Sequence, residues 1–390
     1  MRMDCDIAIV GAGVAGLWLA RELSQQGYHV LLLEKTAIGA GQTLSAQGII
    51  HGGTKYALKG KLTQAALCVA DMPAVWRDCL HGEGSIDLRA VDVLSDTHYL
   101  WTRGKFTSSL KSFVSHKMLS SHSAVLQANQ LPDFFKNPAF DGNLCALSET
   151  VLAVRSLLQA LAKPIQPNIL WGEVTTQHTL TGDIAHLNMQ HASRSAEIHA
   201  QQYIFTAGAG AEPLLENYAP TYLQKRPLHM VWLRFPAGHT PPPVYMHCIE
   251  QGTTPVLTVT THQDQNGQTI WYLGGGLAET GVERDTATQI QTAQHLLQRL
   301  LPWVDLTDCT WFTDRVDRAE GAQRRGNRPD GPVATSVSTN LITAWPTKLA
   351  LAPLLAEKIC SLLGEAFITP QAKPTEHNWP CAPMGEYIWD

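Results

Sequence analysis

Residues 7–34 read IAIVGAGVAGLWLARELSQQGYHVLLLE, which sets out a strand, a glycine-rich turn, a helix and a second strand. The apolar run 7–10 has the composition of a strand buried in a parallel sheet. Apolar residues recur at helical spacing over 14–25, and a second apolar run, 30–33, ends on an acidic residue. The stretch therefore predicts a complete β-α-β unit.

The turn of this unit has the spacing Gly-x-Gly-x-x-Gly. Gly11 permits a tight turn, Gly13 lets the backbone approach a pyrophosphate, and Gly16 allows the helix to pack closely on the strand. The helix begins at Val14 and Ala15, where unpaired amides would face the phosphate charge. Chance occurrence of the glycine spacing is the alternative, but strand, helix and acid are all in register. The turn predicts a bound dinucleotide.

The acidic residue at the end of the second strand indicates which dinucleotides fit. Glu34, followed by Lys35, is placed so that its carboxylate accepts both hydroxyls of an adenosine ribose. A carboxylate there repels a 2′-phosphate, so NADP is disfavoured. The unit fits FAD and NAD equally well, and other segments must decide between them.

Composition excludes several other classes of function. The net charge of −5 and the pI near 6.3 create no basic field, which disfavours nucleic-acid binding. The eight cysteines contain no Cys-x-x-Cys pair, which argues against a zinc site, an iron–sulfur cluster and a dithiol centre, and we expect no metal. The N-terminus lacks the pattern of a signal peptide, and no stretch approaches the roughly 20 apolar residues of a membrane span. We expect a cytoplasmic protein, with peripheral membrane contact left open.

A chain of 390 residues exceeds the usual size of one hydrophobic core, which predicts two domains. The pattern leaves that of a parallel α/β sheet over about 73–143 and again over about 220–310. Extended segments separated by turns in the second of these regions predict an antiparallel sheet. The expected elements are helices over 151–161, 286–301 and 349–363 and strands over 202–206, 228–235, 256–261, 269–273 and 340–344.

Residues 38–53 read IGAGQTLSAQGIIHGG and carry the signal that separates FAD from NAD. The segment resembles the loop that wraps the flavin in the D-amino-acid oxidase-like superfamily. It is most similar to the branch of glycerol-3-phosphate oxidases and dehydrogenases and L-2-hydroxyglutarate oxidases, where Ser-x-x-Gly-x-Ile-His-x-Gly recurs; 55–56 and 59–62 also look like that branch. Ser45 stands where some relatives attach flavin covalently, so the resemblance implies non-covalent FAD. It also implies flavin contacts from Gly41, Gln42, Thr43, Ser45, Gln47, Gly48 and Ile50.

Residues 326–332 (GNRPDGP) and 340–350 (NLITAWPTKLA) resemble the family's Arg-Pro-x-x-x-Asp-Gly stretch and the strand and helix that follow it. In the family, the amides at that helix start lie under the flavin pyrimidine and stabilise negative charge on it. Two departures, the contracted spacing and the exit turn 345–348, put the substrate in doubt but not the cofactor. The resemblance implies cofactor contacts from Val174, Ala207, Gly208, Thr347, Lys348 and Leu349.

Together these features predict a Rossmann-type FAD-binding domain of the α/β class with an inserted α+β substrate domain built on an antiparallel sheet. The FAD-binding domain is expected to be discontinuous, because the matching motifs lie at both ends of the chain. The predicted ranges are 1–75, 144–218 and 318–368 for the FAD-binding domain, 76–143 and 219–317 for the substrate domain, and 369–390 for a C-terminal tail.

The branch chemistry is oxidation of a carbon that bears a hydroxyl or amine, with hydride passing to flavin N5 while a base takes the heteroatom proton. His51 is the candidate base, and contact with flavin or substrate alone is its alternative role. Arg328 and Lys348 are candidates for holding an anionic substrate. Lys348 would alternatively stabilise the reduced flavin, and Arg325 is more simply explained as part of a solvated basic cluster.

The predicted function is an FAD-dependent oxidase or dehydrogenase acting on a small 2-hydroxy acid, amino acid or polyol phosphate. Oxygen or a quinone would reoxidise the flavin, and the sequence does not distinguish them. Two alternatives stay open at this point: an NAD-dependent dehydrogenase, and a flavin-binding subunit that serves electron transfer or assembly in a complex.

Overall fold

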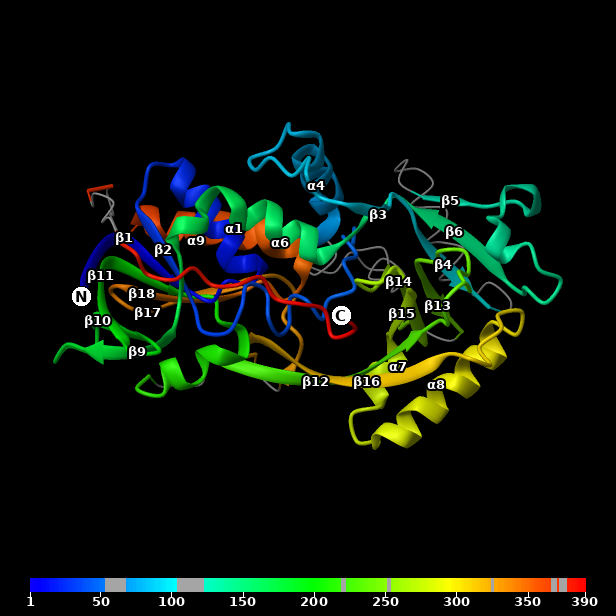
Figure 1. The fold of residues 1–390 in the computed structure, drawn as a ribbon. Helices are drawn as coiled ribbons and strands as arrows, with labels where there is room; N and C mark the ends of the chain where they lie inside the picture. Colours follow the sequence, from blue (N-terminus) through cyan, green and yellow to red (C-terminus); the bar gives the residue numbers. More distant parts are fainter. Residues whose placement is uncertain are drawn as a thin grey trace.

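The computed structural model describes residues 1–52, 68–103, 123–218, 222–250, 254–323, 326–365, 370–371 and 377–390. They form two large sheets that lie side by side along an elongated molecule (Figure 1). Helices cover one face of the first sheet, and the long strands β12 and β16 run along one side of the molecule towards the second sheet. The predicted combination of a parallel α/β sheet with a second, mainly antiparallel sheet is confirmed.

The first sheet is built around the N-terminal unit, since β1 lies between β2 and β11 and pairs with both in parallel. Helix α1 (Val14–Gln25) makes the connection from β1 to β2, as predicted. An antiparallel pair, β9 (Glu173–His178) and β10 (Ile184–His191), extends from β11. In spatial order the main strands are β17 (Val333–Ser338), β18 (Leu341–Trp345), β11 (Arg194–Phe205), β1 (Arg2–Val10), β2 (Val30–Glu34) and β8 (Ile169–Trp171).

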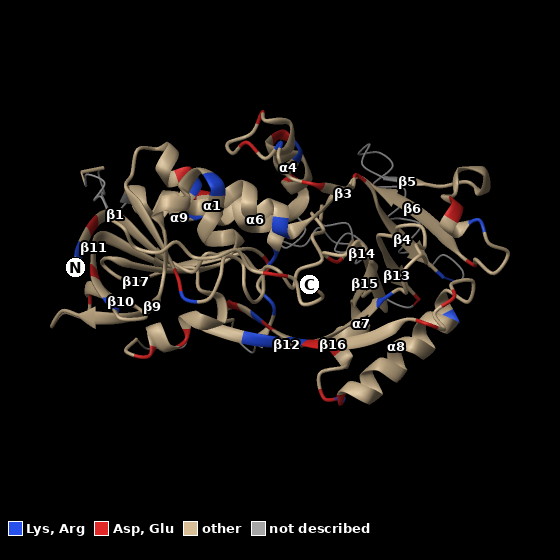
Figure 2. Ribbon diagram, in the orientation of Figure 1, with Lys and Arg blue, Asp and Glu red and all other residues tan. Residues whose placement is uncertain are grey.

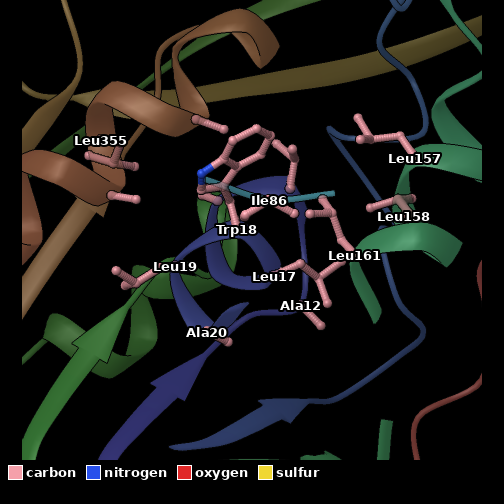
Figure 3. Packing of buried hydrophobic residues seen from close by; sticks show 14 of the residues in the cluster. Ala12, Leu17, Trp18, Leu19, Ala20, Ile86, Leu157, Leu158, Leu161 and Leu355 are labelled. Atoms are coloured by element: carbon pink, nitrogen blue, oxygen red, sulfur yellow. The ribbon is translucent and has the colours of Figure 1, made fainter. Parts of the chain in front are cut away.

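The largest buried core lies between this sheet and its helices, α1, α4 (Met72–His81), α6 (Val154–Ala162) and α9 (Ala352–Glu365). Trp18 of α1 is fully buried at its centre (Figure 3). Its ring lies 4.8 Å from that of Trp76, whose indole N–H donates to the Ala350 carbonyl. One aromatic pair therefore joins three helical segments that are far apart in sequence.

The second sheet has β12 next to β16 at one edge and β4, β6 and β5 at the other. Helix α8 (Thr286–Leu300) packs its apolar face against it, and α7 (Gly276–Thr280) follows β15. A separate pair consists of β3 (Val93–Ser95) and β7 (Val151–Leu152). In spatial order the strands are β16 (Thr310–Gly321), β12 (Leu223–Arg234), β15 (Thr269–Gly274), β14 (Leu257–Gln263), β13 (Met246–Ile249), β4 (His98–Thr102), β6 (Asn143–Leu147) and β5 (Ser123–Val125).

Several predicted boundaries differ from the structure for reasons of packing. The predicted domain change at 144 falls inside β6, which pairs with β4 in the second sheet. Likewise the change at 318 falls inside β16, which pairs with β12 up to Gly321. Residues 76–91, assigned to the substrate domain, contribute side chains to the core under the first sheet. The helix predicted from 151 begins at 154, because β7 uses residues 151–152.

The C-terminal segment, which the sequence describes only as a tail, packs between the two sheets (Figure 1). Trp389 is buried, and its ring stacks on Tyr387 at 4.7 Å and lies 5.1 Å from His262 of β14. The Trp389 carbonyl accepts a hydrogen bond of 2.6 Å from Arg234 of β12. These contacts place His262 in an apolar aromatic environment.

His262 should make the folded protein sensitive to mild acid. Burial lowers the pKa of His262 from 6.5 to about 4. Between these two pH values the imidazole is protonated in the unfolded chain but neutral in the folded protein. Stability is therefore full above pH 6.5 and falls as pH drops towards 4, by about 2 kcal/mol between pH 7 and pH 5. Urea unfolding at these two pH values measures the effect. His262→Gln, which stays neutral and retains a partner for Thr260, should reduce the pH dependence by that amount; an unchanged dependence would contradict the assignment.

Candidate active site

The glycine-rich turn lies where the carboxyl ends of β1 and β11 meet, and two of its glycines are required by close contacts. Gly11 has φ +105°, and a Cβ there would lie 2.6 Å from the Ala207 Cα. A Cβ on Gly16 would lie 2.0 Å from the Gly11 carbonyl oxygen. Gly13 caps α1 without a side chain, so the amides of the first helical turn face this end of the sheet. This cradle fits the pyrophosphate of a dinucleotide.

The predicted ribose contact and several other predicted cofactor contacts lie beside this cradle. Glu34 ends β2, and its carboxylate accepts hydrogen bonds from the Ala12 amide (2.9 Å) and the Thr36 amide (2.8 Å). Glu34 pairs with Trp171 of β8, and the chain continues through Gly172 into β9, where Val174 lies. The Lys35 ammonium lies near Gly210, in the turn that contains Ala207 and Gly208. The structure thus brings these sequence-predicted residues to one end of the sheet.

The predicted flavin-wrapping loop runs across the second sheet from one strand to the next. At its start Gln42 accepts a hydrogen bond from the Ala319 amide of β16 (3.0 Å). In its middle Gln47 donates to the Tyr272 carbonyl of β15 (2.9 Å) and to Thr260 Oγ1 of β14 (3.4 Å). The loop also remains attached to the cradle. The Val14 amide of α1 donates to Thr43 Oγ1 (3.3 Å). Within the loop the Ser45 amide donates to the Gly41 carbonyl (3.3 Å), and the Tyr272 hydroxyl of β15 donates to the Ser45 carbonyl (3.1 Å).

The end of the loop pairs with the segment before α6. Gly48 accepts from the Leu152 amide (2.9 Å), and Ile50 donates to the Thr150 carbonyl (2.8 Å). This antiparallel pairing brings the next residue of the loop, His51, beside Glu149. The candidate base therefore has a carboxylate partner that is distant in sequence.

Glu149 is a buried carboxylate, and among the described residues His51 and Gly52 contact its two oxygens. One oxygen lies 3.3 Å from His51 Nδ1, and the other accepts from the Gly52 amide at 2.8 Å. Burial alone would raise the Glu149 pKa, but the hydrogen bond and charge of His51, the charge of His98 and the Gly52 amide together lower it to about 2. The side chain is thus a fixed negative charge at neutral pH, which orients the His51 ring.

Two further histidines surround this pair, and the sequence analysis did not single them out. The His51 ring stacks on His247 of β13 at 5.3 Å, and His98 of β4 lies 4.4 Å from His247 edge to face. The parallel pairing of β13 with β4 brings His247 and His98 together. His247 Nδ1 and Thr258 Oγ1 are 2.8 Å apart. We call His51, His98, His247 and Glu149 the histidine cluster.

The C-terminal motif forms a strained turn at the end of β18. Thr347 has φ +63°, an unfavourable conformation for a β-branched residue, and its hydroxyl donates to the Gly331 carbonyl at 2.9 Å. Lys348 comes next and caps a short 3₁₀ turn, Leu349–Leu351, that leads into α9. Such outliers are concentrated at functional sites. The strain at Thr347 marks this turn as a candidate part of the site.

Positive charge gathers where β12 and β16 pair, close to the loop contact at Ala319. Burial, and then the charges of Arg226 and Arg328, lower the pKa of Arg318 to about 10. Arg226 is paired with buried Glu320 (2.6 Å), and Arg318 is 3.7 Å from Glu279. Arg328 Nε is buried and has no hydrogen-bond partner within the described residues. Figure 2 shows basic residues on β12 at this junction. We call Arg226, Arg318 and Arg328 the arginine group.

Some of the residues singled out in the sequence cannot be placed. Gly53, Arg325, 55–56 and 59–62 lie outside the described residues.

A surface cavity of about 540 Å³ between α1, α4 and α9 is lined by Glu22, Met72 and Glu357, and lies on the helical layer away from the loop. No helix within the described ranges is long and apolar enough to cross a membrane.

Comparison with known proteins identifies the cofactor and the family. The profile described as "DAO: FAD dependent oxidoreductase" matches residues 6–361. The probable FAD-dependent oxidoreductase PA4991 of Pseudomonas aeruginosa is 42% identical over 391 residues, covering 100% of this chain and 98% of that protein. Its crystal structure superimposes with a TM-score of 0.84 at 38% identity over 100% of this chain and 98% of that one.

More distant relatives show the fold or match only in part. Glycine oxidase from Geobacillus kaustophilus has a TM-score of 0.67 at 14% identity, covering 95% of this chain and 100% of that one. The aerobic glycerol-3-phosphate dehydrogenase of Staphylococcus haemolyticus is 30% identical over 107 residues, which are 27% of this chain and 18% of that protein. FAD, and not NAD, is therefore the cofactor, and the chain belongs to the DAO family of FAD-dependent oxidoreductases.

Proposed function

We propose that the protein oxidises a C–OH or C–NH bond of a small anionic substrate, with His51 as the base that takes the heteroatom proton. Bound non-covalently, FAD supplies the hydride acceptor at N5. The observation that carries the proposal is the course of residues 42–51, which run from the dinucleotide cradle across the second sheet to the histidine cluster. One end of this loop holds the cofactor and the other end presents a polarised imidazole.

Glu149 supports the role of His51 because it is a fixed charge at hydrogen-bond distance from Nδ1. A carboxylate on one ring nitrogen holds the ring in one orientation and makes the imidazole a stronger base. It also stabilises the imidazolium that results. His247, stacked on the same ring, restricts its rotation. In this proposal Glu149 and His247 are positioning residues, and His51 is the group that contacts the substrate.

The arginine group supports an anionic substrate. Its three guanidinium groups face two carboxylates, Glu279 and Glu320, so the local charge is positive. The Nε of Arg328 is buried without a partner among the described residues, and a guanidinium is suited to pair with a carboxylate or phosphate. In this proposal Arg328 binds the substrate anion, and Lys348, at the strained turn before α9, stabilises negative charge on the cofactor side.

The proposal also names the chemical class of the substrate. Partial similarity to an aerobic glycerol-3-phosphate dehydrogenase, over 27% of this chain, favours the hydroxyl-oxidising branch. Solved structures described as glycine oxidase and L-proline dehydrogenase share the fold and represent amine oxidation. We therefore propose a 2-hydroxy acid, an amino acid or a polyol phosphate, and either oxygen or a quinone as the acceptor.

Anaerobic reduction of the bound flavin tests this function directly. We expect one class among 2-hydroxy acids, amino acids, amines and polyol phosphates to bleach the flavin absorbance, and Arg328→Met to weaken the response by about tenfold or more, since a charge-assisted pair is lost. Readmitting air separates an oxidase, which recovers its absorbance at once, from a dehydrogenase. Acid precipitation should release FAD into the supernatant if it is held non-covalently.

A flavin-binding subunit that only transfers electrons or supports assembly is the second candidate. That protein would keep its FAD and be reduced by a partner or artificial donor, but by none of the four substrate classes. His51→Asn distinguishes the two candidates. Substrate-driven bleaching should be slowed on the order of 10²-fold if His51 is the base. Unchanged reduction in the variant with FAD still bound would remove His51 from the proposal.

A further inference from the structure

A second group of potential ligands lies on the strands β10 and β11, apart from the cofactor. His186, Glu197 and His199 each offer one ligand atom, and these three atoms all lie within 4.8 Å of one another. The His186 and His199 rings stack at 5.0 Å with an interplanar angle of 27°. His199 Nε2 is 3.2 Å from a Glu197 carboxylate oxygen.

Strand pairing explains why these residues meet. Leu187 pairs with Ile198 in the antiparallel ladder of β10 and β11, and both side chains are buried. Side chains alternate along a strand, so the neighbouring positions, His186 on one strand and Glu197 and His199 on the other, lie together on the opposite face. Directly opposed positions in such a ladder have Cβ atoms about 4.5–5.5 Å apart, which suits two imidazoles on one ion.

This face carries the carboxylates of Glu197 and Asp4, with the N-terminal ammonium and Arg2 close to Glu197. Glu197 is more than half exposed, and its carboxylate lies within hydrogen-bond distance of His199 Nε2. The next strand, β1, presents Asp4 opposite His199. Asp4 is held by Arg2 through contacts of 2.6–3.1 Å, which leaves Glu197 as the carboxylate shared by the two histidines.

We propose that His186, Glu197 and His199 bind a divalent transition metal of the zinc class. Two imidazoles and one carboxylate are the ligand types that such ions prefer, and solvent would complete the coordination. The site lies beside the N-terminus, at the end of the first sheet away from the second sheet (Figure 1). A bound ion would connect β10 to β11 and stabilise that end of the sheet, independently of FAD chemistry.

Titration of the FAD-loaded, full-length protein with Zn²⁺ tests the proposal by calorimetry. We expect one ion per chain, a rise in the melting temperature on adding Zn²⁺, and a loss of affinity of at least about tenfold in His186→Ala and in His199→Ala. A Cu²⁺ complex of the wild type should show two nitrogen ligands by electron paramagnetic resonance, and each histidine variant should lose one.

Two control variants test whether Zn²⁺ binds at another site. His295→Ala removes an exposed histidine from α8, and Cys381→Ser removes an exposed thiol; both should bind Zn²⁺ as the wild type does. If the wild type binds no Zn²⁺, or if both strand variants retain full affinity, the proposal is wrong. Loss of binding only in Cys381→Ser would assign the ion to that thiol and would also overturn it.

Discussion

Replacing Gly11 by alanine is expected to remove FAD from the protein. The new Cβ would lie 2.6 Å from the Ala207 Cα, 2.8 Å from its nitrogen and 2.9 Å from the Thr206 carbonyl carbon. Backbone atoms cannot move aside as a flexible side chain can, and φ at this residue is +105°. The turns at the ends of β1 and β11 must separate. The purified variant should retain less than about a tenth of the wild-type flavin, a loss of more than about 1.4 kcal/mol in binding.

Gly27→Ala is the matched control for this experiment. Gly27 also has positive φ, +92°, but a Cβ there would meet no atom within 4 Å. Both variants impose the same kind of backbone strain, but only Gly11→Ala forces the turns that form the cradle apart. The ratio of flavin to protein absorbance after gel filtration measures the difference, and circular dichroism confirms that each variant is folded. Equal FAD content in the two variants would show that the close approach of the turns is not needed for binding.

Replacing Glu149 by glutamine is expected to lower turnover on the order of 10²-fold while FAD stays bound. The amide can still accept from the Gly52 N–H, but the charge beside His51 is lost. Because a negative neighbour favours the protonated imidazole, its removal should move the acid limb of the kcat/KM profile to lower pH. Stopped-flow reduction of the flavin across pH, with whichever substrate class bleaches it, measures both effects.

The stability of the same variant gives a readout that does not depend on the substrate. The Glu149 pKa is lowered from 4.5 to about 2, so its contribution is present above pH 4.5 and lost as pH falls towards 2, by about 3 kcal/mol in all. Glu149→Gln should lack this acid-dependent loss. Gln289→Leu, which removes a buried, non-ionisable side chain that donates to the His229 and Leu277 carbonyls, should destabilise the protein but leave this acid-dependent loss in place. A shift in both variants would deny Glu149 a specific role.

Local signals explain how far the sequence could predict this fold. The β-α-β unit is contiguous, and its glycines, helix and acidic residue all act within 28 residues, 7–34. The wrapping loop follows directly, so its motif could be read from neighbouring letters. His51 could be singled out as a candidate from this motif. The contacts of the loop and of His51 with the second sheet could not be predicted, because they depend on how β13, β14 and β15 are arranged.

The partners of His51 could not be predicted because three chain segments supply them. Glu149 lies 98 residues along the chain from His51, and the parallel pairing of β4 with β13 connects positions almost 150 residues apart. Parallel pairing leaves no hairpin signature in a sequence. The single available clue was the histidine content, 16 residues, which does not show which ones meet. His186 and His199 lie close in sequence on two consecutive antiparallel strands, and they were missed for a different reason: the prediction of no metal considered cysteine spacing alone.

The interleaved order of the first sheet has a consequence for synthesis of the protein. Strand β1 needs β11 on one side, and β11 needs β18, whose last residue is 345. At about 5–20 residues per second, a ribosome takes roughly 20–70 s to deliver these strands in turn. The apolar edge of β1 has no neighbour until residue 205 has been made, roughly 10–40 s at these rates, and until then it is a surface that chaperones would be expected to cover. The cofactor site is thus among the last parts of the molecule to be completed on the ribosome, although its most recognisable motif is the first to emerge.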